Sequence, residues 1–328
     1  MIRTPPNLKI NLWSPLPPSS SGIADYVAES LPALARHVDL RLVADAPEAA
    51  PAWRERYPVF SPAAAPEADL DLYHLGNSPP HAWVYRAACA RPGVAVLHDW
   101  SLHHLVLRET VERGEVSAYL REMRRAHGAT GTFVGRQVAR ALGGDLLPSL
   151  FPLNDRVLEG SLAVVGLTEH VRSRAAHRLP GRPVLHLRHH LFLPLDPPPS
   201  REDARRALGL PQGALVVTAP GLATASKRLD LAVRAAARLR AAHPSLRLVV
   251  AGEADPSLPL SAWVREARLG EGFVLTGRLS LEDFERHLCA ADVVLSLRFP
   301  THGEISGALV RGLGVGRPGR RRAARERT

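Results

Sequence analysis

The sequence predicts an α/β protein with two Rossmann-like, doubly wound domains, and three observations predict this class. At 328 residues the chain is long for one domain and suits two. Short apolar runs alternate with longer amphipathic stretches, as in parallel sheets covered by helices on both faces. A proline-rich stretch at 194–200, PLDPPPS, interrupts this alternation, which then restarts. We therefore expect a first domain at 1–195, a second at 196–318 and a polybasic tail at 319–328.

The expected elements follow the alternation in order. Strands are expected at 8–12, 38–43, 70–75, 94–97 and 162–167, and then at 214–219, 246–251, 273–276 and 293–297. Helices are expected at 23–36 and 115–142, and then at 201–208, 227–242, 261–269, 281–290 and 307–313. Ser200 is expected to cap the helix at 201–208. Because ligands of doubly wound sheets bind at the carboxyl ends of the strands, we expect the two domains to face each other across a ligand cleft.

The charge is unevenly distributed along the chain. The formal net charge is +10, and the last twelve residues, with six Arg and one Glu, carry half of it. The remainder is only mildly basic, which suits an enzyme with an anionic substrate better than a nucleic-acid-binding protein.

The cysteines and the apolar segments indicate the compartment. Cys89 and Cys289 lie far apart and form neither a disulfide framework nor a metal pattern, as in a reducing cytoplasm. The N-terminal stretch lacks the apolar core of a signal peptide, and no apolar run approaches the roughly 18 residues of a membrane span. We expect a cytoplasmic protein with at most peripheral contact to a membrane.

Two segments of the first domain could carry chemistry. After the first strand, Ser21-Gly22 precedes a helix, where backbone amides and the positive helix end suit a phosphate. An ordinary helix cap in a flexible loop explains the same residues equally well. After the strand at 94–97, His98-Asp99 faces the expected cleft, where a histidine can orient a reacting sugar. A lone histidine there is more often packed, and the spacing to His103 and His104 matches no standard zinc pattern.

Two segments of the second domain are also candidates. Lys227 and Arg228 stand at a helix start and suit a diphosphate, although a solvated basic helix face is the alternative. No glycine directly precedes Lys227, which argues against a P-loop. After the last expected strand, Glu304 could accept hydrogen bonds from sugar hydroxyls or stabilise positive charge at an anomeric carbon. The alternative is a glutamate stabilised only by the helix dipole.

These segments together resemble the family-four retaining glycosyltransferases, which have the GT-B fold. The resemblance runs from about residue 7 to about residue 318. It is carried by Pro15-Leu16-Pro17-Pro18, Ser21-Gly22-Ile23-Ala24-Asp25-Tyr26, Leu75-Gly76-Asn77 with His81, Pro92-Gly93, Leu97-His98-Asp99, Ser226-Lys227-Arg228, Val250-Ala251-Gly252, Thr276-Gly277-Arg278, Ala291-Asp292-Val293 and Gly303-Glu304-Ile305-Ser306-Gly307.

The resemblance implies transfer of a hexose from a nucleoside-diphosphate sugar to a saccharide or lipid-linked acceptor, with retention of configuration. It also implies that neither a metal ion nor another cofactor takes part. The implied catalytic residues are His98 near the reacting centre, Lys227 at the departing diphosphate and Glu304 at the donor sugar. The implied donor-binding residues are Gly22, Arg228, Ser306 and Gly307, and the acceptor-side residues are Asn77, His81 and Asp99.

The sequence departs from the family pattern in three places. The family often has an arginine shortly after the first strand of the second domain, where this chain has Pro220-Gly221-Leu222-Ala223. The second glutamate, which binds the donor ribose, falls near Arg311 or Gly312. Beyond Pro318 a further apolar strand is expected, yet the sequence is polybasic. This pattern predicts a truncated or frameshifted end and an incomplete second domain, in which activity could be lost.

Two other functions remain open on the sequence. An inactive GT-B relative would bind a nucleotide sugar without transferring it. An anion-binding or nucleic-acid-binding interaction protein would act through its basic tail. The sequence does not indicate the donor sugar, the nucleotide base, the acceptor or the oligomeric state.

Overall fold

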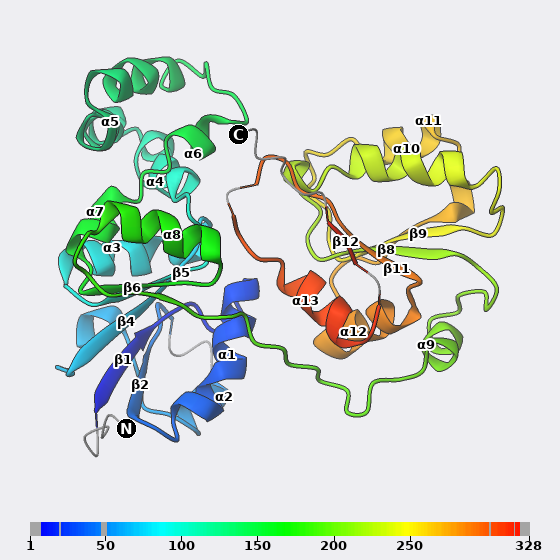
Figure 1. Ribbon diagram of the computed structural model, residues 1–328, viewed down its shortest axis with the longest axis horizontal. Helices are drawn as coiled ribbons and strands as arrows, with labels where there is room; N and C mark the ends of the chain where they lie inside the picture. The colour runs from blue at the N-terminus through cyan, green and yellow to red at the C-terminus, as the bar shows by residue number, and fades with distance from the viewer. Residues whose placement is uncertain (1–7, 20, 47–50, 302, 318, 322–328) are drawn as a thin grey trace. The chain divides into compact units, whose positions relative to one another are not determined.

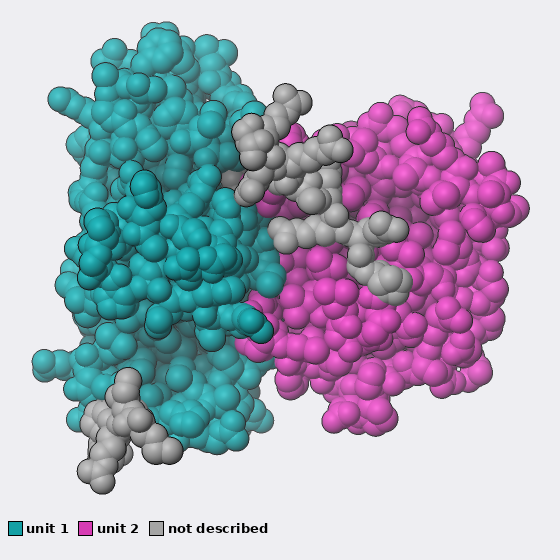
Figure 2. All heavy atoms as spheres, viewed as in Figure 1, with its two compact units in different colours: residues 1–188, 302–305 teal, residues 189–301, 306–328 magenta. Residues whose placement is uncertain are grey.

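The computed structural model describes residues 8–19, 21–46, 51–301, 303–317 and 319–321. The chain divides into two compact units, coloured separately in Figure 2. The first comprises residues 1–188 with 302–305, and the second comprises residues 189–301 with 306–328. The division thus precedes His189, whereas the sequence pattern placed a boundary after residue 195. The grouping of residues 302–305 with the first unit has no counterpart in the sequence pattern.

The first unit is built on a seven-stranded parallel sheet with the order β3-β2-β1-β4-β5-β6-β7. Figure 1 labels its strands β1, β2, β4, β5 and β6. The strands are β1 (Lys9–Trp13), β2 (Asp39–Val43), β3 (Val59–Phe60), β4 (Leu70–Leu75), β5 (Val94–Leu97), β6 (Ala163–Gly166) and β7 (Val184–His186). The expected strands at 70–75 and 94–97 are confirmed in full. The short strands β3 and β7 were not predicted, because runs of two and three residues at the edges of the sheet are too short to show a pattern.

Alternating side chains give this sheet a core on each face. On one face Trp13, Tyr73 and Leu97 pack with buried residues of α3, α4, α5, α7 and α8. On the other face Leu12 and Val96 pack with buried residues of α1. The helices are α1 (Gly22–Leu34), α2 (Pro51–Arg54), α3 (Ala82–Ala90), α4 (His103–Glu109), α5 (Val116–Val138), α6 (Leu147–Leu150), α7 (Asp155–Gly160) and α8 (Glu169–Arg178).

The second unit contains a five-stranded parallel sheet with the order β10-β9-β8-β11-β12. The strands are β8 (Val216–Pro220), β9 (Arg247–Ala251), β10 (Phe273–Leu275), β11 (Val293–Ser296) and β12 (Gly319–Arg321). The sequence pattern assigned residues 319–328 to a polybasic tail, and the first three of these residues form β12. Backbone pairing with β11 needs no apolar side chain at the edge of a sheet, so Gly319–Arg321 extend the sheet despite their polar composition.

Helices cover both faces of this second sheet as well. Leu248 and Val250 of β9 pack against α10 and α11, whereas Val294 of β11 packs with residues of α12 and α13. The α-helices are α9 (Arg201–Ala207), α10 (Leu229–Leu239), α11 (Leu260–Glu266), α12 (Leu281–Ala290) and α13 (Gly307–Gly314). The predicted cap is confirmed, because the Ser200 hydroxyl accepts a hydrogen bond from the amide of Asp203 at 3.1 Å.

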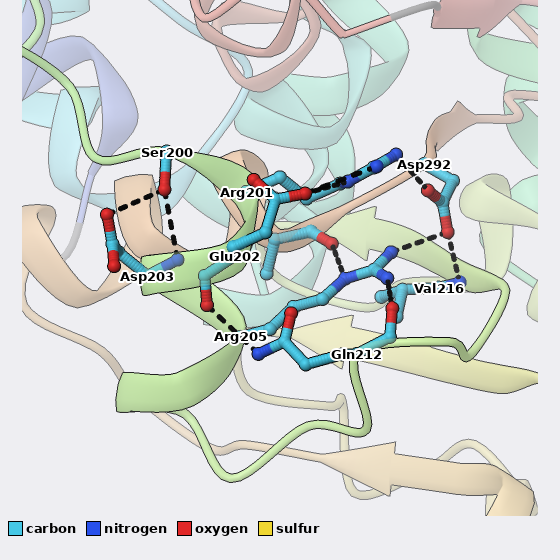
Figure 3. A network of polar contacts seen from close by, with 9 residues as sticks. Ser200, Arg201, Glu202, Asp203, Arg205, Gln212, Val216 and Asp292 are labelled. Atoms are coloured by element: carbon cyan, nitrogen blue, oxygen red, sulfur yellow. Dashed lines mark hydrogen bonds and ion pairs between the residues drawn. The ribbon is translucent and has the colours of Figure 1, made fainter.

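A buried ion pair between Arg205 and Asp292 connects α9 to the sheet (Figure 3). Arg205 of α9 is almost completely buried, and its Nη2 lies 2.6 Å from Oδ2 of Asp292. Its Nε donates to the carbonyl of Ala290 at 3.0 Å. Asp292 also accepts from Arg201 at 3.0 Å and from the amide of Val216 at 2.8 Å. The carboxylate therefore joins α9 to the beginnings of β8 and β11, and both charges are hydrogen-bonded as burial requires.

None of the helices described here is long and apolar enough to span a bilayer.

Candidate functional site

Both sheets have the strand order of doubly wound nucleotide-binding folds, and this order fixes where ligands bind. The chain reverses its direction of growth between β1 and β4 in the first unit, and between β8 and β11 in the second. Ligands of such sheets bind at the carboxyl ends of the strands at this switch point. The segments that follow these four strands contain most of the predicted site residues.

In the first unit a chain of hydrogen bonds runs from α1 into the sheet. The hydroxyl of Ser21 caps α1 by accepting from the amide of Ile23, and it lies 3.2 Å from Nε2 of His81. His81 is completely buried, and its Nδ1 lies 3.1 Å from the carbonyl of His74. A carbonyl only accepts, so Nδ1 carries the proton, and Nε2 then accepts from the Ser21 hydroxyl. Every member of this chain is oriented by its neighbour.

The series of hydrogen bonds continues through a pair of imidazoles. Nδ1 of His74, in β4, lies 3.0 Å from Nε2 of His98, which follows β5. Tyr26 of α1 packs edge-on against the His98 ring, with 4.9 Å between the ring centroids. Burial lowers the pKa of His74 to about 3 and that of His81 to about 4, so both are neutral at pH 7. His98 is half-buried at this end of the sheet, in the position predicted for it.

His74 belongs to this cluster but was not predicted. It lies in the expected strand at 70–75, one residue before the strand ends, and a single histidine within an apolar run gives no signal by itself. The signal that could have found it is the alternation of the strand, since its neighbours Tyr73 and Leu75 pack on one face of the sheet and His74 must therefore point to the other.

Asn77 and Asp99 brace the loops that follow β4 and β5. The amide of Asn77 donates to Oδ2 of Asp99 at 2.8 Å, and Oδ1 of Asn77 accepts from the amide of Leu105 in α4 at 3.0 Å. His81 is buried behind Ser21 and does not reach solvent. These contacts give Asn77, His81 and Asp99 a structural role, and their assignment to the acceptor side stays a prediction.

Gly22 and Glu304 differ in their exposure. Gly22 begins α1 and is exposed, and a Cβ added there would meet no atom within 4 Å. Space for a ligand is therefore present beside its backbone. Glu304 is buried and belongs to the segment that groups with the first unit. In that segment the carbonyl of Gly303 accepts from Oγ1 of Thr168 at 2.7 Å, and Ile305 packs with the core on the α1 face.

In the second unit Lys227 lies at the carboxyl end of β8. It ends the 3-10 turn η5 (Ala225–Lys227), and its Nζ donates to the carbonyl of Pro220, the last residue of β8, at 2.7 Å. Burial, followed by the nearby charge of Arg298, lowers the pKa of Lys227 to about 7. The ammonium therefore stands over the end of the strand, in surroundings that disfavour its charged form and that a nearby anion would compensate.

Two glycines let the backbone come close beneath this ammonium. Gly221 has a φ of +78°, and a Cβ there would lie 3.0 Å from Nζ of Lys227. Gly252, after β9, has a φ of +150°, and a Cβ there would lie 2.7 Å from the carbonyl carbon of Gly221. Neither position accommodates a side chain without displacing its neighbour.

Arg228 is held by an acidic neighbour. Its Nε and Nη2 lie 3.0 and 2.9 Å from the two carboxylate oxygens of Asp230, which also pairs with Arg234 at 2.9 Å. Arg298, which follows β11, was not predicted, and its charge acts on Lys227. The sequence signal that could have found it is its place two residues after the end of a strand next to β8.

Ser306 and Gly307 form the predicted helix start. The Ser306 hydroxyl accepts from the amide of Leu309 at 3.2 Å, so Ser306 caps α13. Gly307 is the first helical residue, and a Cβ there would lie 3.3 Å from Nε2 of His189. Because α13 follows β11, its positive end lies on the carboxyl side of the sheet. Among the residues that the structure describes, no group of three His, Cys, Asp or Glu side chains is placed to hold a metal ion.

Comparison with known proteins places this fold among glycosyltransferase structures. Residues 200–299, less than a third of the chain, match the family described as Glycosyl transferases group 1. Among proteins with curated descriptions, none matches the chain.

Solved structures extend the likeness to both units. The chain is similar to HepE from Anabaena in complex with UDP and glucose, at 16% identity and a TM-score of 0.60 over 95% of this chain and 80% of that one. It is also similar to the sucrose-phosphate synthase of Thermosynechococcus elongatus, at 15% identity and a TM-score of 0.56, with the same coverage. WaaG, a glycosyltransferase involved in lipopolysaccharide biosynthesis, gives 14% identity and a TM-score of 0.56, again with that coverage. At such identities the likeness establishes the fold, and the predicted α/β class with two Rossmann-like units of the GT-B kind is confirmed.

Proposed function

We propose that this protein is a retaining glycosyltransferase, which moves a hexose from a nucleoside-diphosphate sugar to a hydroxyl group of a saccharide or lipid-linked saccharide. One observation carries the proposal. The Lys227 ammonium is fixed over the carboxyl end of β8, at the switch point of the second sheet, by its hydrogen bond to Pro220. A half-buried ammonium in that place suits the diphosphate of a nucleotide.

The comparisons support the same reading. The segment that matches group 1 glycosyl transferases includes β8, Lys227 and β11. HepE, which shares the fold, was solved with UDP and glucose, the two parts of a nucleotide sugar. A nucleotide-sugar donor for this chain is consistent with both.

In the proposed reaction Lys227 neutralises the diphosphate as it leaves the sugar, a role that a metal ion would otherwise take. A lysine whose pKa is near 7 in the free protein becomes fully protonated when a dianion binds beside it. Because the charge on the leaving group grows toward the transition state, this interaction strengthens as the bond breaks. Ser306 and Gly307 would add the positive end of α13, and Gly22 that of α1.

The remaining roles concern the sugar and the acceptor. We assign His98 to the reacting centre, since His74 and Tyr26 hold its ring at the end of β5. Glu304 would accept hydrogen bonds from donor hydroxyls, and Asn77, His81 and Asp99 would shape the acceptor side. With a lipid-linked acceptor the protein would work at a membrane surface in the cytoplasm.

A thermal-shift screen across UDP-, ADP-, GDP- and TDP-sugars tests the proposal, followed by a transfer assay with the donor that stabilises most. We expect one nucleotide to raise the melting temperature by several degrees and the assay to release the corresponding nucleoside diphosphate. A chain that binds a donor but transfers it to none of a broad acceptor pool would instead be an inactive binding protein. No stabilisation by any donor would contradict both readings.

A further inference from the structure

We propose that Arg298 supplies a second positive charge to the donor diphosphate, in addition to that of Lys227. This inference rests on the proposed function and assigns to Arg298 a part that we had predicted for Arg228. Arg298 follows β11, the neighbour of β8 on the far side of the switch point.

The backbone brings Arg298 to Lys227. The amide of Phe299 donates to the carbonyl of Ser226 at 2.7 Å, which joins the segment after β11 to the turn that carries Lys227. Ser226 and Lys227 are adjacent in sequence, as are Arg298 and Phe299, so the two cationic residues flank one hydrogen bond. The Lys227 ammonium is itself fixed at the end of β8. The two charges therefore come from neighbouring strands at the place where this fold binds its ligand.

The electrostatics agree with this placement. The charge of Arg298 adds to burial in lowering the pKa of Lys227, so the two cations are close enough to oppose each other. Both side chains are half-buried, where such repulsion is screened less than at the surface. A diphosphate bound beside both would turn this repulsion into two attractive interactions. An arginine also suits phosphate oxygens through its planar set of donors.

Arg228 is less suited to this part. It binds both carboxylate oxygens of Asp230, so much of its charge is already compensated within the protein. Arg228, which is adjacent to Lys227 in sequence, is thus directed to Asp230, whereas the charge of Arg298, 71 positions after Lys227, acts on the Lys227 ammonium.

Calorimetric titration of the full chain with UDP, ADP and GDP tests this assignment, with the matching nucleoside as a probe that lacks the diphosphate. We expect Arg298→Gln to weaken binding of the preferred diphosphate about 10- to 100-fold, the size expected for charge-assisted hydrogen bonds. Nucleoside affinity should change less than about 2-fold. Arg228→Gln should cost less than Arg298→Gln. Arg234→Gln, an exposed partner of the same Asp230, is the matched control and should leave affinity within about 2-fold.

Two further measurements separate a charge effect from a loss of structure. Arg298→Lys keeps the charge and should recover part of the affinity, and it serves as the test variant if Arg298→Gln does not fold. Removal of the arginine should also raise the pKa of Lys227, so that proton uptake on diphosphate binding begins at a higher pH than in the wild type.

The titrations distinguish a failure of the role of Arg298 from a failure of the proposed function. Wild-type affinity in Arg298→Gln, or an equal loss for the diphosphate and the nucleoside, overturns the role of Arg298 and leaves the proposed function standing. A larger loss in Arg228→Gln than in Arg298→Gln overturns it in favour of Arg228. A wild-type chain that binds none of the three diphosphates overturns the proposed function, and the role of Arg298 with it.

Discussion

The two switch points share a topology and differ in their chemistry. In the first unit Ser21, His81, His74 and His98 are hydrogen-bonded to one another in series, and burial keeps His74 and His81 neutral at pH 7. In the second unit the residues after β8 and β11 include two cations that oppose each other. The strand order fixes where polar groups gather, and the side chains then decide whether the place suits hydroxyl groups or an anion.

This difference predicts where each unit should show the effect of a mutation. The imidazoles of the first unit are satisfied before any ligand arrives, so the loss of one should weaken folding. The two cations of the second unit oppose each other in the free protein, and a bound anion would attract both, so the loss of one should weaken binding and turnover more than folding.

The largest expected effect is that of Lys227→Ala on turnover. Under the proposed function the variant loses the charge that neutralises the departing diphosphate, and kcat should fall about 10²- to 10³-fold. The thermal midpoint should stay constant or rise, because the variant removes a half-buried cation that the charge of Arg298 opposes. A steady-state transfer assay measures kcat, and thermal unfolding measures the midpoint. Normal turnover would remove the central element of the proposed function.

A smaller loss of turnover is expected for His98→Gln in the first unit. Without the imidazole at the reacting centre, kcat should fall roughly 10²-fold. Diphosphate affinity should change little, since the proposed charges for that group lie in the second unit. Titration with the nucleoside diphosphate, beside the transfer assay, separates the two effects. A large loss of diphosphate affinity would show that the division between the units does not hold.

The next effect is on stability. His81→Phe removes two hydrogen bonds from a completely buried side chain, and we expect a loss of about 2 kcal/mol in the free energy of unfolding. His104→Phe is the matched control, because His104 is exposed on α4, and it should change stability by less than about 0.5 kcal/mol. Urea unfolding measures both. Equal losses of stability in the two variants would contradict a structural role for the hydrogen bonds of His81.

The variant His81→Phe should also alter the pH dependence of the free energy of unfolding. Folding lowers the pKa of His74 to about 3 and of His81 to about 4, whereas both titrate near 6.5 when unfolded. Between about pH 4 and 6.5 the unfolded chain binds more protons, so stability falls with falling pH by about 1.4 kcal/mol per unit for each histidine. His81→Phe should reduce this slope by one proton, and an unchanged slope would contradict the shift.

The sequence predicted most of the fold, because its signals are local. Apolar runs and caps located β4, β5 and α12 without error, and they identified Ser200 as a cap. It could not predict β12, since that strand depends on backbone pairing with β11 and not on its own side chains.

The site was predicted less completely, for a related reason. Lys227 could be found because it stands at the start of an expected helix, and His98 because it directly follows an expected strand. His74 and Arg298 acquire their meaning only from neighbours on another strand, at the His98 ring and at Ser226 and Lys227. Pairing between parallel strands determines those contacts, and the spacing of residues along one chain does not reveal it.

The smallest effect tests the second unit through pH alone. Since Lys227 has a pKa of about 7 in the free protein, its neutral form prevails above that pH, and diphosphate binding must then recruit a proton. Affinity should therefore fall with rising pH above about 7, approaching tenfold per unit, and binding at pH 8 should take up close to one proton. Calorimetry in two buffers of different ionisation enthalpy measures that uptake. Lys227→Met, which has no titrating group at this position, should show neither the fall nor the uptake, and a wild-type slope in this variant would assign the proton to another group.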